Sequence, residues 1–352
     1  AHPTYDDYWA AIDVEDKWGE IAAPALNMGG WFDLYGPQTF VNFNGLRKHG
    51  RTPEARQSRL IVGPWPHGLS RSTRTGDVDF GDNSLADLDD LELRWFDYWL
   101  KGIDNGVTEE APLRLFIMGV NEWRDEQEWP LARAVQTKYY LHSGGKANSK
   151  QGDGSLSTTS PQSEAQDVYL YNPANPVPTT GGALCCNPYF AANGAYDQNE
   201  VEERQDVLVY STLPLERDME VTGPVTVTLW ASTSATDTDF TAKLVDVCEA
   251  GCARNLTDGI IRARYRDSMS NPTLLEPNRA YCYEIDLWAT SNVFKAGHRI
   301  RLEVSSSNFP RFDRNTNTGN IIAEDTELRP ALQTVFHDVQ QASYISLSVV
   351  PR

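Results

Sequence analysis

The sequence predicts an α/β unit followed by an all-β body. In the first part, apolar runs at residues 21–32 and 59–65 flank a segment with helical spacing, which is the pattern of a strand, a crossover helix and a parallel strand. From Pro112 onward, apolar and polar residues alternate in many short runs that turn residues separate, as in a β-sandwich or jelly roll. This change of period predicts a domain boundary after residue 110.

The chain begins with a segment of helical spacing and continues into the first strand. Tyr5, Trp9 and Ile12 recur at helical intervals, so we expect a helix between Tyr5 and Trp18. Residues 21–32 are expected to form the first strand and its turn, and Gly29-Gly30 let the backbone bend sharply because Gly accepts positive φ angles.

Each of the two strands delivers a potentially catalytic side chain just beyond its end. Asp33 follows the first strand and His67 follows the second, 67 − 33 = 34 positions later. Residues 34–49 have the apolar spacing of the intervening helix, and 34 positions suit one helical crossover. Because the carboxyl ends of parallel strands meet at one edge of a sheet, we expect Asp33 and His67 to face each other.

An Asp that orients a His supplies two of the three groups of a nucleophilic triad. The carboxylate binds one ring nitrogen and stabilises the imidazolium, while the other ring nitrogen takes the proton of a Ser or Cys. In strand-to-helix nucleophile motifs the nucleophile precedes the acid and the His. No G-x-S-x-G occurs in the sequence, and the nearest imitation, residues 68–72, lacks the last Gly and follows the His. The nucleophile is therefore expected outside this sequence.

A strong helix is predicted between Ser84 and Gly102. Ser84 is the expected cap with Asp87 as its capping-box carboxylate, and Gly102 is a natural stop. Its broad apolar face consists of Leu88, Leu91, Leu93, Trp95, Phe96, Trp99 and Leu100. Two parallel strands cannot bury both faces of a sheet, so residues 20–100 should expose apolar surface unless another polypeptide or a second copy covers it.

The remaining sequence predicts short strands and irregular crossings. Residues 144–166 are rich in Ser, Gly, Thr and Gln, which is typical of a long loop. Strands are expected at residues 113–117, 139–142, 168–171, 207–211, 221–230, 239–247, 259–265, 280–288, 298–305 and 344–350.

Composition and charge exclude several classes of partner. The formal net charge is −18, which argues against nucleic acid and against anionic membrane surfaces, because both require basic patches. No apolar run approaches the ~20 residues of a membrane span. The first residues, AHPTYDDYW, contain no initiator Met, basic n-region or apolar h-region, so no signal peptide is present in them.

The five cysteines leave several pairings open. Cys248 and Cys252 flank Glu-Ala-Gly at an expected hairpin tip and could form a disulfide, whereas Cys185 and Cys186 are adjacent and Cys282 is isolated. If disulfides exist, an oxidising compartment follows, as for a secreted or periplasmic protein. No C-x-x-C pair or clustered His supports a zinc site, and we expect no metal.

Several long motifs resemble one family of serine hydrolases, which includes cocaine esterase, X-Pro dipeptidyl-peptidases and α-amino-acid ester hydrolases. The resemblance covers nearly the whole chain. The motifs are GGWFD (residues 29–33), RLIVGPWPHG (59–68), RWFDYWLKGIDNG (94–106), DVLVYSTLPLERDMEVTGPV (206–225), DTDFTAKLVDV (237–247) and GHRIRLEVSSSNFPRFDRN (297–315).

The resemblance implies an architecture and a role for each strand-end residue. Residues 1–20 would be the end of a helical cap region, residues 21–110 the C-terminal part of an α/β-hydrolase domain, and residues 111–352 a jelly roll. Asp33 would be the triad acid and His67 the triad base. The family's nucleophilic Ser, and a Tyr that helps to bind the oxyanion, come from an earlier part of the hydrolase domain that this sequence does not contain.

We therefore expect part of a serine hydrolase that cleaves ester or amide bonds, acyl or X-Pro peptidyl, in small-molecule substrates without any cofactor. Trp31, Phe32 and Trp65 flank the two catalytic candidates and are expected to shape the acyl pocket. The isolated chain should be inactive, since it lacks the nucleophile. Two alternatives remain: a jelly-roll module that binds carbohydrate or a partner through an exposed aromatic platform, and a pseudoenzyme subunit that naturally lacks its nucleophile.

Overall fold

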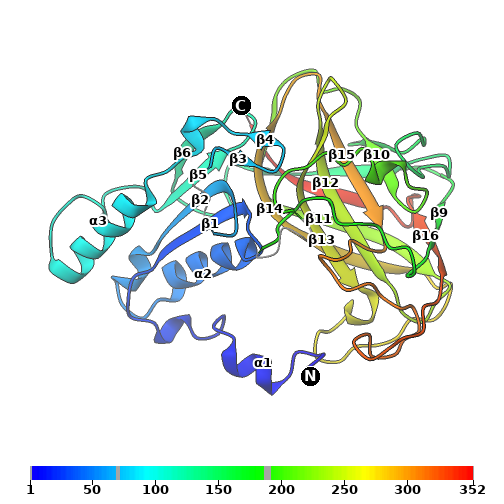
Figure 1. The fold of residues 1–352 in the computed structure, drawn as a ribbon, viewed down its shortest axis with the longest axis horizontal. Helices are drawn as coiled ribbons and strands as arrows, with labels where there is room; N and C mark the ends of the chain where they lie inside the picture. The colour runs from blue at the N-terminus through cyan, green and yellow to red at the C-terminus, as the bar shows by residue number, and fades with distance from the viewer. Residues whose placement is uncertain (1, 69–71, 186–191, 352) are drawn as a thin grey trace.

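Two main sheets organise the part of the chain described by the computed structural model, residues 2–68, 72–185 and 192–351. One is a four-stranded sheet near the N-terminus, with the order β1-β2-β5-β6. The other has eleven strands and runs through the rest of the chain. Figure 1 shows the two sheets side by side, with β14 of the larger sheet next to the smaller one.

The N-terminal segment is less helical than its spacing predicts. One short helix, α1, covers Asp7–Ile12, and a 3₁₀ turn, η1, covers Trp18–Glu20. At Asp13 the backbone is extended, and its carboxylate accepts the backbone N–H of Glu15 at 2.9 Å. Such a local bond offers the backbone an alternative to the helix, so the predicted helix ends after less than two turns.

The predicted strand–helix–strand unit is present. Strand β1 (Leu26–Phe32) pairs in parallel with β2 (Arg59–Pro66), and helix α2 (Gly36–His49) connects them across one face. Phe40, Phe43 and Leu46 form the buried side of α2. The pairing is regular to Gly30 and then shifts by a bulge, so that both strands end beside each other.

The four-stranded sheet extends beyond the predicted boundary at residue 110. Strand β5 (Leu113–Ile117) pairs in parallel with β2, and β6 (Glu122–Glu126) pairs antiparallel with β5. The four-stranded sheet therefore takes in two strands from beyond residue 110. Alternation of period two identifies a strand but does not say which sheet the strand joins. Strand β1 remains at the edge of the sheet.

Helix α3 (Leu88–Lys101) begins later than predicted. Its N-cap is Asp87, whose carboxylate accepts the N–H of Asp90 at 2.9 Å. Ser84 instead lies in the 3₁₀ turn η3 (Asp82–Ser84) and donates its hydroxyl to the carbonyl of Gly81. Gly102 ends the helix at φ 69° as predicted.

The apolar face of α3 is only partly covered. Trp95 is buried, but Leu93, Phe96 and Leu100 are 57%, 53% and 77% exposed. Figure 1 shows α3 at the outer end of the small sheet, far from the eleven-stranded sheet.

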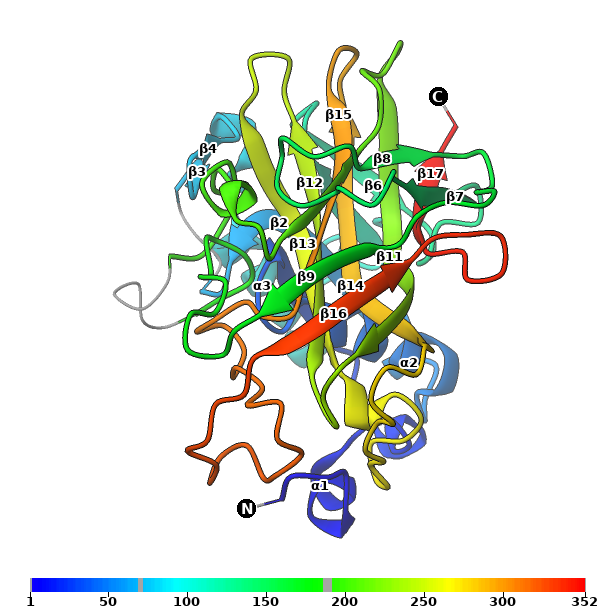
Figure 2. The same ribbon diagram turned by 90° about the vertical axis from the view of Figure 1, so that its right-hand side faces the viewer.

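The region that we call the β body, residues 135–350, contains the eleven-stranded sheet. Most predicted strands are found, but β8 and β16 were not predicted, and β13 begins six residues earlier than expected because buried polar residues such as Asn255 interrupt its apolar pattern. Figure 2 shows β9 and β16 paired across the face turned to the viewer. The strands are β7 (Val135–His142), β8 (Ser155–Ser157), β9 (Asp167–Tyr171), β10 (Leu208–Ser211), β11 (Met219–Thr233), β12 (Asp239–Val247), β13 (Ala253–Arg262), β14 (Tyr281–Phe294), β15 (Arg299–Ser305), β16 (Ala331–Phe336) and β17 (Tyr344–Val350).

The described residues include a disulfide and a free thiol. A disulfide joins Cys248 to Cys252 between β12 and β13, and Cys282 is an exposed thiol. Cys186 lies outside the described residues. Within the described part of the chain, no helix has the length and apolarity needed to cross a membrane, and no group of three or more potential metal ligands is found.

Gly30 lies where β1 and β2 approach each other too closely to leave room for a side chain. A Cβ atom at this position would lie 2.0 Å from the carbonyl oxygen of Trp65. We expect Gly30→Ala to lower the free energy of unfolding by about 1–3 kcal/mol, the usual cost of overpacking, as measured by urea denaturation. Gly19→Ala is the matched control, since a Cβ there meets only the carbonyl of His49 at 3.8 Å. Equal urea midpoints for the two variants would contradict the prediction that a Cβ at Gly30 destabilises the fold.

Candidate active site

Asp33 and His67 lie together at the carboxyl ends of β1 and β2. The two side chains meet with His67 Nδ1 3.1 Å from Asp33 Oδ1. The same carboxylate oxygen accepts the backbone N–H of Tyr35 at 2.9 Å, and the N–H of Asp33 donates to the carbonyl of Gly30 at 3.1 Å. The turn after β1 therefore fixes the carboxylate before the His approaches it.

The two side chains differ in their access to solvent. Only 8% of the Asp33 side chain is exposed, compared with 38% of the His67 side chain. A buried carboxylate on Nδ1 selects the tautomer that carries its proton on Nδ1, which leaves Nε2 to accept a proton. The ring of Tyr35 packs edge-on against His67, with 5.3 Å between centroids. Tyr35 was not predicted from the sequence, although its position two residues after a strand-end Asp is typical of an Asx turn.

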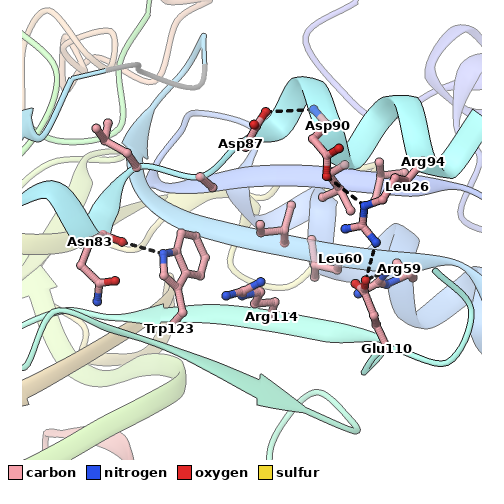
Figure 3. A pocket seen from close by; sticks show the side chains of 14 residues that line it. Leu26, Arg59, Leu60, Asn83, Asp87, Asp90, Arg94, Glu110, Arg114 and Trp123 are labelled. Atoms are coloured by element: carbon pink, nitrogen blue, oxygen red, sulfur yellow. Dashed lines mark hydrogen bonds and ion pairs between the residues drawn. The ribbon is translucent and has the colours of Figure 1, made fainter. Parts of the chain in front are cut away.

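A pocket against this sheet lies at the other end of its strands. The pocket lies between α3 and the sheet (Figure 3) and has a volume of about 320 Å³. Leu26 and Arg59 in its lining are the first residues of β1 and β2. Arg59 and Arg94 both pair with Glu110, at 2.8 and 2.5 Å. Although burial acts to raise it, these guanidinium groups hold the pKa of the Glu110 carboxyl below its ordinary value. The pocket is therefore separate from Asp33 and His67.

Comparison with known proteins identifies the family. Residues 105–346 match the family described as "X-Pro dipeptidyl-peptidase C-terminal non-catalytic domain". Residues 1–69, which include Asp33 and His67, match "X-Pro dipeptidyl-peptidase (S15 family)". The chain belongs to the X-Pro dipeptidyl-peptidase family. The resemblance inferred from the sequence motifs is thereby confirmed.

Individual relatives of this X-Pro dipeptidyl-peptidase family member are longer than the chain. It is 41% identical to a cocaine esterase of Rhodococcus sp. (strain MB1 Bresler), with 100% of this chain and 60% of that protein covered. An aminopeptidase from a marine sediment archaeon, Thaumarchaeota archaeon, superposes with a TM-score of 0.85 at 28% identity. A selenomethionine-labelled α-amino acid ester hydrolase superposes with a TM-score of 0.82 at 26% identity. Both superpositions cover 99% of this chain and 59% of the other.

The aromatic residues of the two family motifs are buried in the core. Trp31, Phe32 and Trp65 are 5%, 1% and 1% exposed. The Trp31 indole N–H donates to the carbonyl of Phe116 at 2.8 Å, and that of Trp65 donates to the carbonyl of Ser84 at 3.1 Å. The chain itself encloses these rings, and the expectation that they shape the acyl pocket stays a prediction.

Part of the near-match to a nucleophile motif cannot be followed in the structure. Residues 69–71 of the segment 68–72 lie outside the described residues. Gly68, the last described residue before them, has φ 96°, a conformation that L side chains rarely adopt.

Proposed function

We propose that this chain supplies the acid and the base of a Ser-His-Asp triad in a serine hydrolase that cleaves ester or amide bonds. The observation that carries the proposal is the 3.1 Å contact between His67 Nδ1 and Asp33 Oδ1 at adjacent ends of two parallel strands. Both residues belong to the segment that matches the S15 family. The chain also resembles a cocaine esterase and an α-amino acid ester hydrolase, which supports acyl or X-Pro peptidyl substrates of low molecular mass.

The proposed mechanism follows from which ring nitrogen each partner takes. His67 Nε2 takes the proton of the Ser hydroxyl as its oxygen attacks the carbonyl carbon, and then gives that proton to the leaving group. Asp33 holds Nδ1 and stabilises the imidazolium that forms between these steps. Water then repeats the sequence on the acyl-enzyme, which releases the acid and restores the Ser.

We further propose that the four-stranded sheet is the C-terminal part of an α/β-hydrolase sheet and that the β body is a jelly roll. The nucleophile then belongs to a polypeptide segment outside this sequence, which pairs with the edge of β1 and covers the exposed face of α3. Three observations support this segment: β1 ends the sheet, Leu93, Phe96 and Leu100 are exposed, and the chain spans 60% of the cocaine esterase. Alternatively, a second copy of this chain covers the same face.

The chain alone provides the test of this proposal. Homogeneous 39.4 kDa material, verified by intact mass under denaturing conditions, should hydrolyse a p-nitrophenyl ester only at the background rate and should not react with a fluorophosphonate. The longer gene product should react at a single Ser outside residues 1–352. Full ester turnover by the 39.4 kDa chain, with labelling of one of its own Ser residues, would overturn the proposal.

A further inference from the structure

A buried hydrogen bond ties the strand that leads to His67 to a neighbouring hairpin. Thr75 is 3% exposed, and its hydroxyl donates to the carbonyl of Pro64 at 2.7 Å. Pro64 lies in β2, three residues before His67. Thr75 ends the short strand β3 (Arg74–Thr75), which pairs with β4 (Val78–Asp79) in a hairpin. The hairpin is therefore bonded directly to the end of the strand that His67 follows.

The tip of the hairpin lies directly against the β body. The N–H of Asp77 donates to the carbonyl of Ala195 at 2.8 Å. Gly76 has φ 65°, and a Cβ atom there would lie 2.2 Å from the same carbonyl oxygen. A Cβ on Gly194 would lie 2.7 Å from the nitrogen of Gly76. The two backbones thus approach as closely as only Gly permits, and this contact fixes the register of the hairpin.

Arg254, in β13 of the β body, holds this contact together with one guanidinium group. Its Nη1 lies 3.0 Å from Asp77 Oδ2 and 3.3 Å from Asp197 Oδ2. The N–H of Asp197 also donates to Asp77 Oδ2 at 3.4 Å. Arg254 therefore joins the hairpin tip to the segment around residue 197, which itself bridges to β13.

The exposure of these side chains determines what kind of role they can have. The Arg254, Asp77 and Asp197 side chains are 27%, 41% and 38% exposed. Ion pairs with this degree of exposure add little to global stability. Misplacement of a reacting group by about 1 Å, in contrast, can lower a rate by about 10²-fold. The arrangement is thus suited to alignment of a neighbouring segment more than to stabilisation of the fold.

We propose that Arg254 is a positioning residue for His67, acting through Asp77 and the Thr75–Pro64 hydrogen bond. The inference rests on the proposed function, since it assigns a role to the base of that triad. It means that the part of the chain matching the "non-catalytic domain" helps to align the His that the other part provides.

The test uses Arg254→Met and Asp77→Asn in the longer gene product, with Arg329→Met as the matched control. Arg329 pairs with Glu327 at 2.6 Å elsewhere on the β body. Arg254→Met and Asp77→Asn should each lower kcat for a p-nitrophenyl ester about 10-fold, within the range for a misplaced group. Their KM values and urea midpoints should equal those of the control. Arg254→Lys should restore part of kcat, because a single nitrogen contacts both carboxylates.

Two further measurements separate the possible failures. Amide hydrogen exchange in the 352-residue chain should be faster at residues 72–80 in Arg254→Met than in Arg329→Met. The role of Arg254 would be overturned if Arg254→Met and Asp77→Asn both left kcat and amide exchange unchanged while His67→Ala was inactive. The proposed function would then still stand. Full activity of His67→Ala would overturn the proposed function and the role of Arg254 with it.

Discussion

Replacement of His67 by Ala in the longer gene product is expected to lower kcat for an activated ester by about 10⁶-fold, as for other triad bases. Asp33 Oδ1 lies 3.1 Å from Nδ1 of the His67 ring. The other ring nitrogen, Nε2, is therefore left to accept the proton of the nucleophile, and the Ala variant removes it. Asp33→Asn should lower kcat by about 10⁴-fold, because an amide can donate to Nδ1 and then stabilises the wrong tautomer. Steady-state kinetics with a p-nitrophenyl ester measure both effects.

A matched variant guards against a loss of activity through misfolding. His49 lies at the exposed end of α2, where its ring stacks on Trp18, so His49→Ala should keep kcat within twofold of the parent protein. The urea midpoints of the three variants should agree. A kcat for His67→Ala within tenfold of the parent would remove His67 from the proposed triad.

The sequence was most informative where function depends on local order along the chain. Asp33 and His67 each follow a strand directly, and parallel strands place such residues at one edge, so their proximity could be anticipated from one crossover. The ring of Tyr35 escaped notice, although its neighbour Asp33 was already identified, because a turn residue carries no hydrophobic period.

Features that depend on contacts between distant segments could not be predicted. Strand β5 alternates like a strand of the β body, but it pairs with β2. Trp31 and Trp65 stand two positions before the catalytic candidates in sequence, yet both rings are buried, and their indole N–H groups bond to the carbonyls of the distant residues Phe116 and Ser84. Arg254 and Asp77 are 177 positions apart, and neither lies in a pattern that would distinguish it from other surface charges.

A buried charge cluster in the β body illustrates the same limit for stability. Asp167 and His337 are fully buried, with His337 Nε2 2.8 Å from Asp167 Oδ2. Asp167 also accepts hydrogen bonds from the hydroxyls of Ser143 and Tyr210 and from the N–H of Ala147. On the sequence alone, His337 had no partner pattern, because its partner is 170 positions away.

Further titratable groups surround this pair. His337 Nδ1 lies 3.4 Å from Glu164 Oε2, and Glu164 Oε1 lies 2.7 Å from His142 Nδ1. Burial acts to raise the pKa of Asp167, but the hydrogen bonds from His337, Ala147, Ser143 and Tyr210 hold it below its ordinary value. Burial acts to lower the pKa of His337, but Asp167 and Glu164 raise it above its ordinary value.

These directions determine how stability should depend on pH. The depressed pKa of Asp167 adds stability that is present above the ordinary Asp pKa and is lost as pH falls through the depressed value. The raised pKa of His337 adds stability that is present below the ordinary His pKa of 6.5 and is lost as pH rises through the raised value. The contribution of the pair is therefore greatest at mildly acidic pH.

Asp167→Asn is expected to lower the free energy of unfolding by about 3–5 kcal/mol at pH 6, because it leaves a buried imidazolium without its counter-charge. Urea denaturation of the 352-residue chain measures the loss, and Glu327→Gln, in an exposed ion pair, should leave the midpoint unchanged. His337→Gln removes the titrating ring, so the stability difference between parent and variant should shrink as pH rises from 6 to 9. If the difference in unfolding free energy between the parent and His337→Gln stays constant over this range, the folded protein does not stabilise the protonated form of His337. The His337 imidazole would then be neutral in the buried cluster.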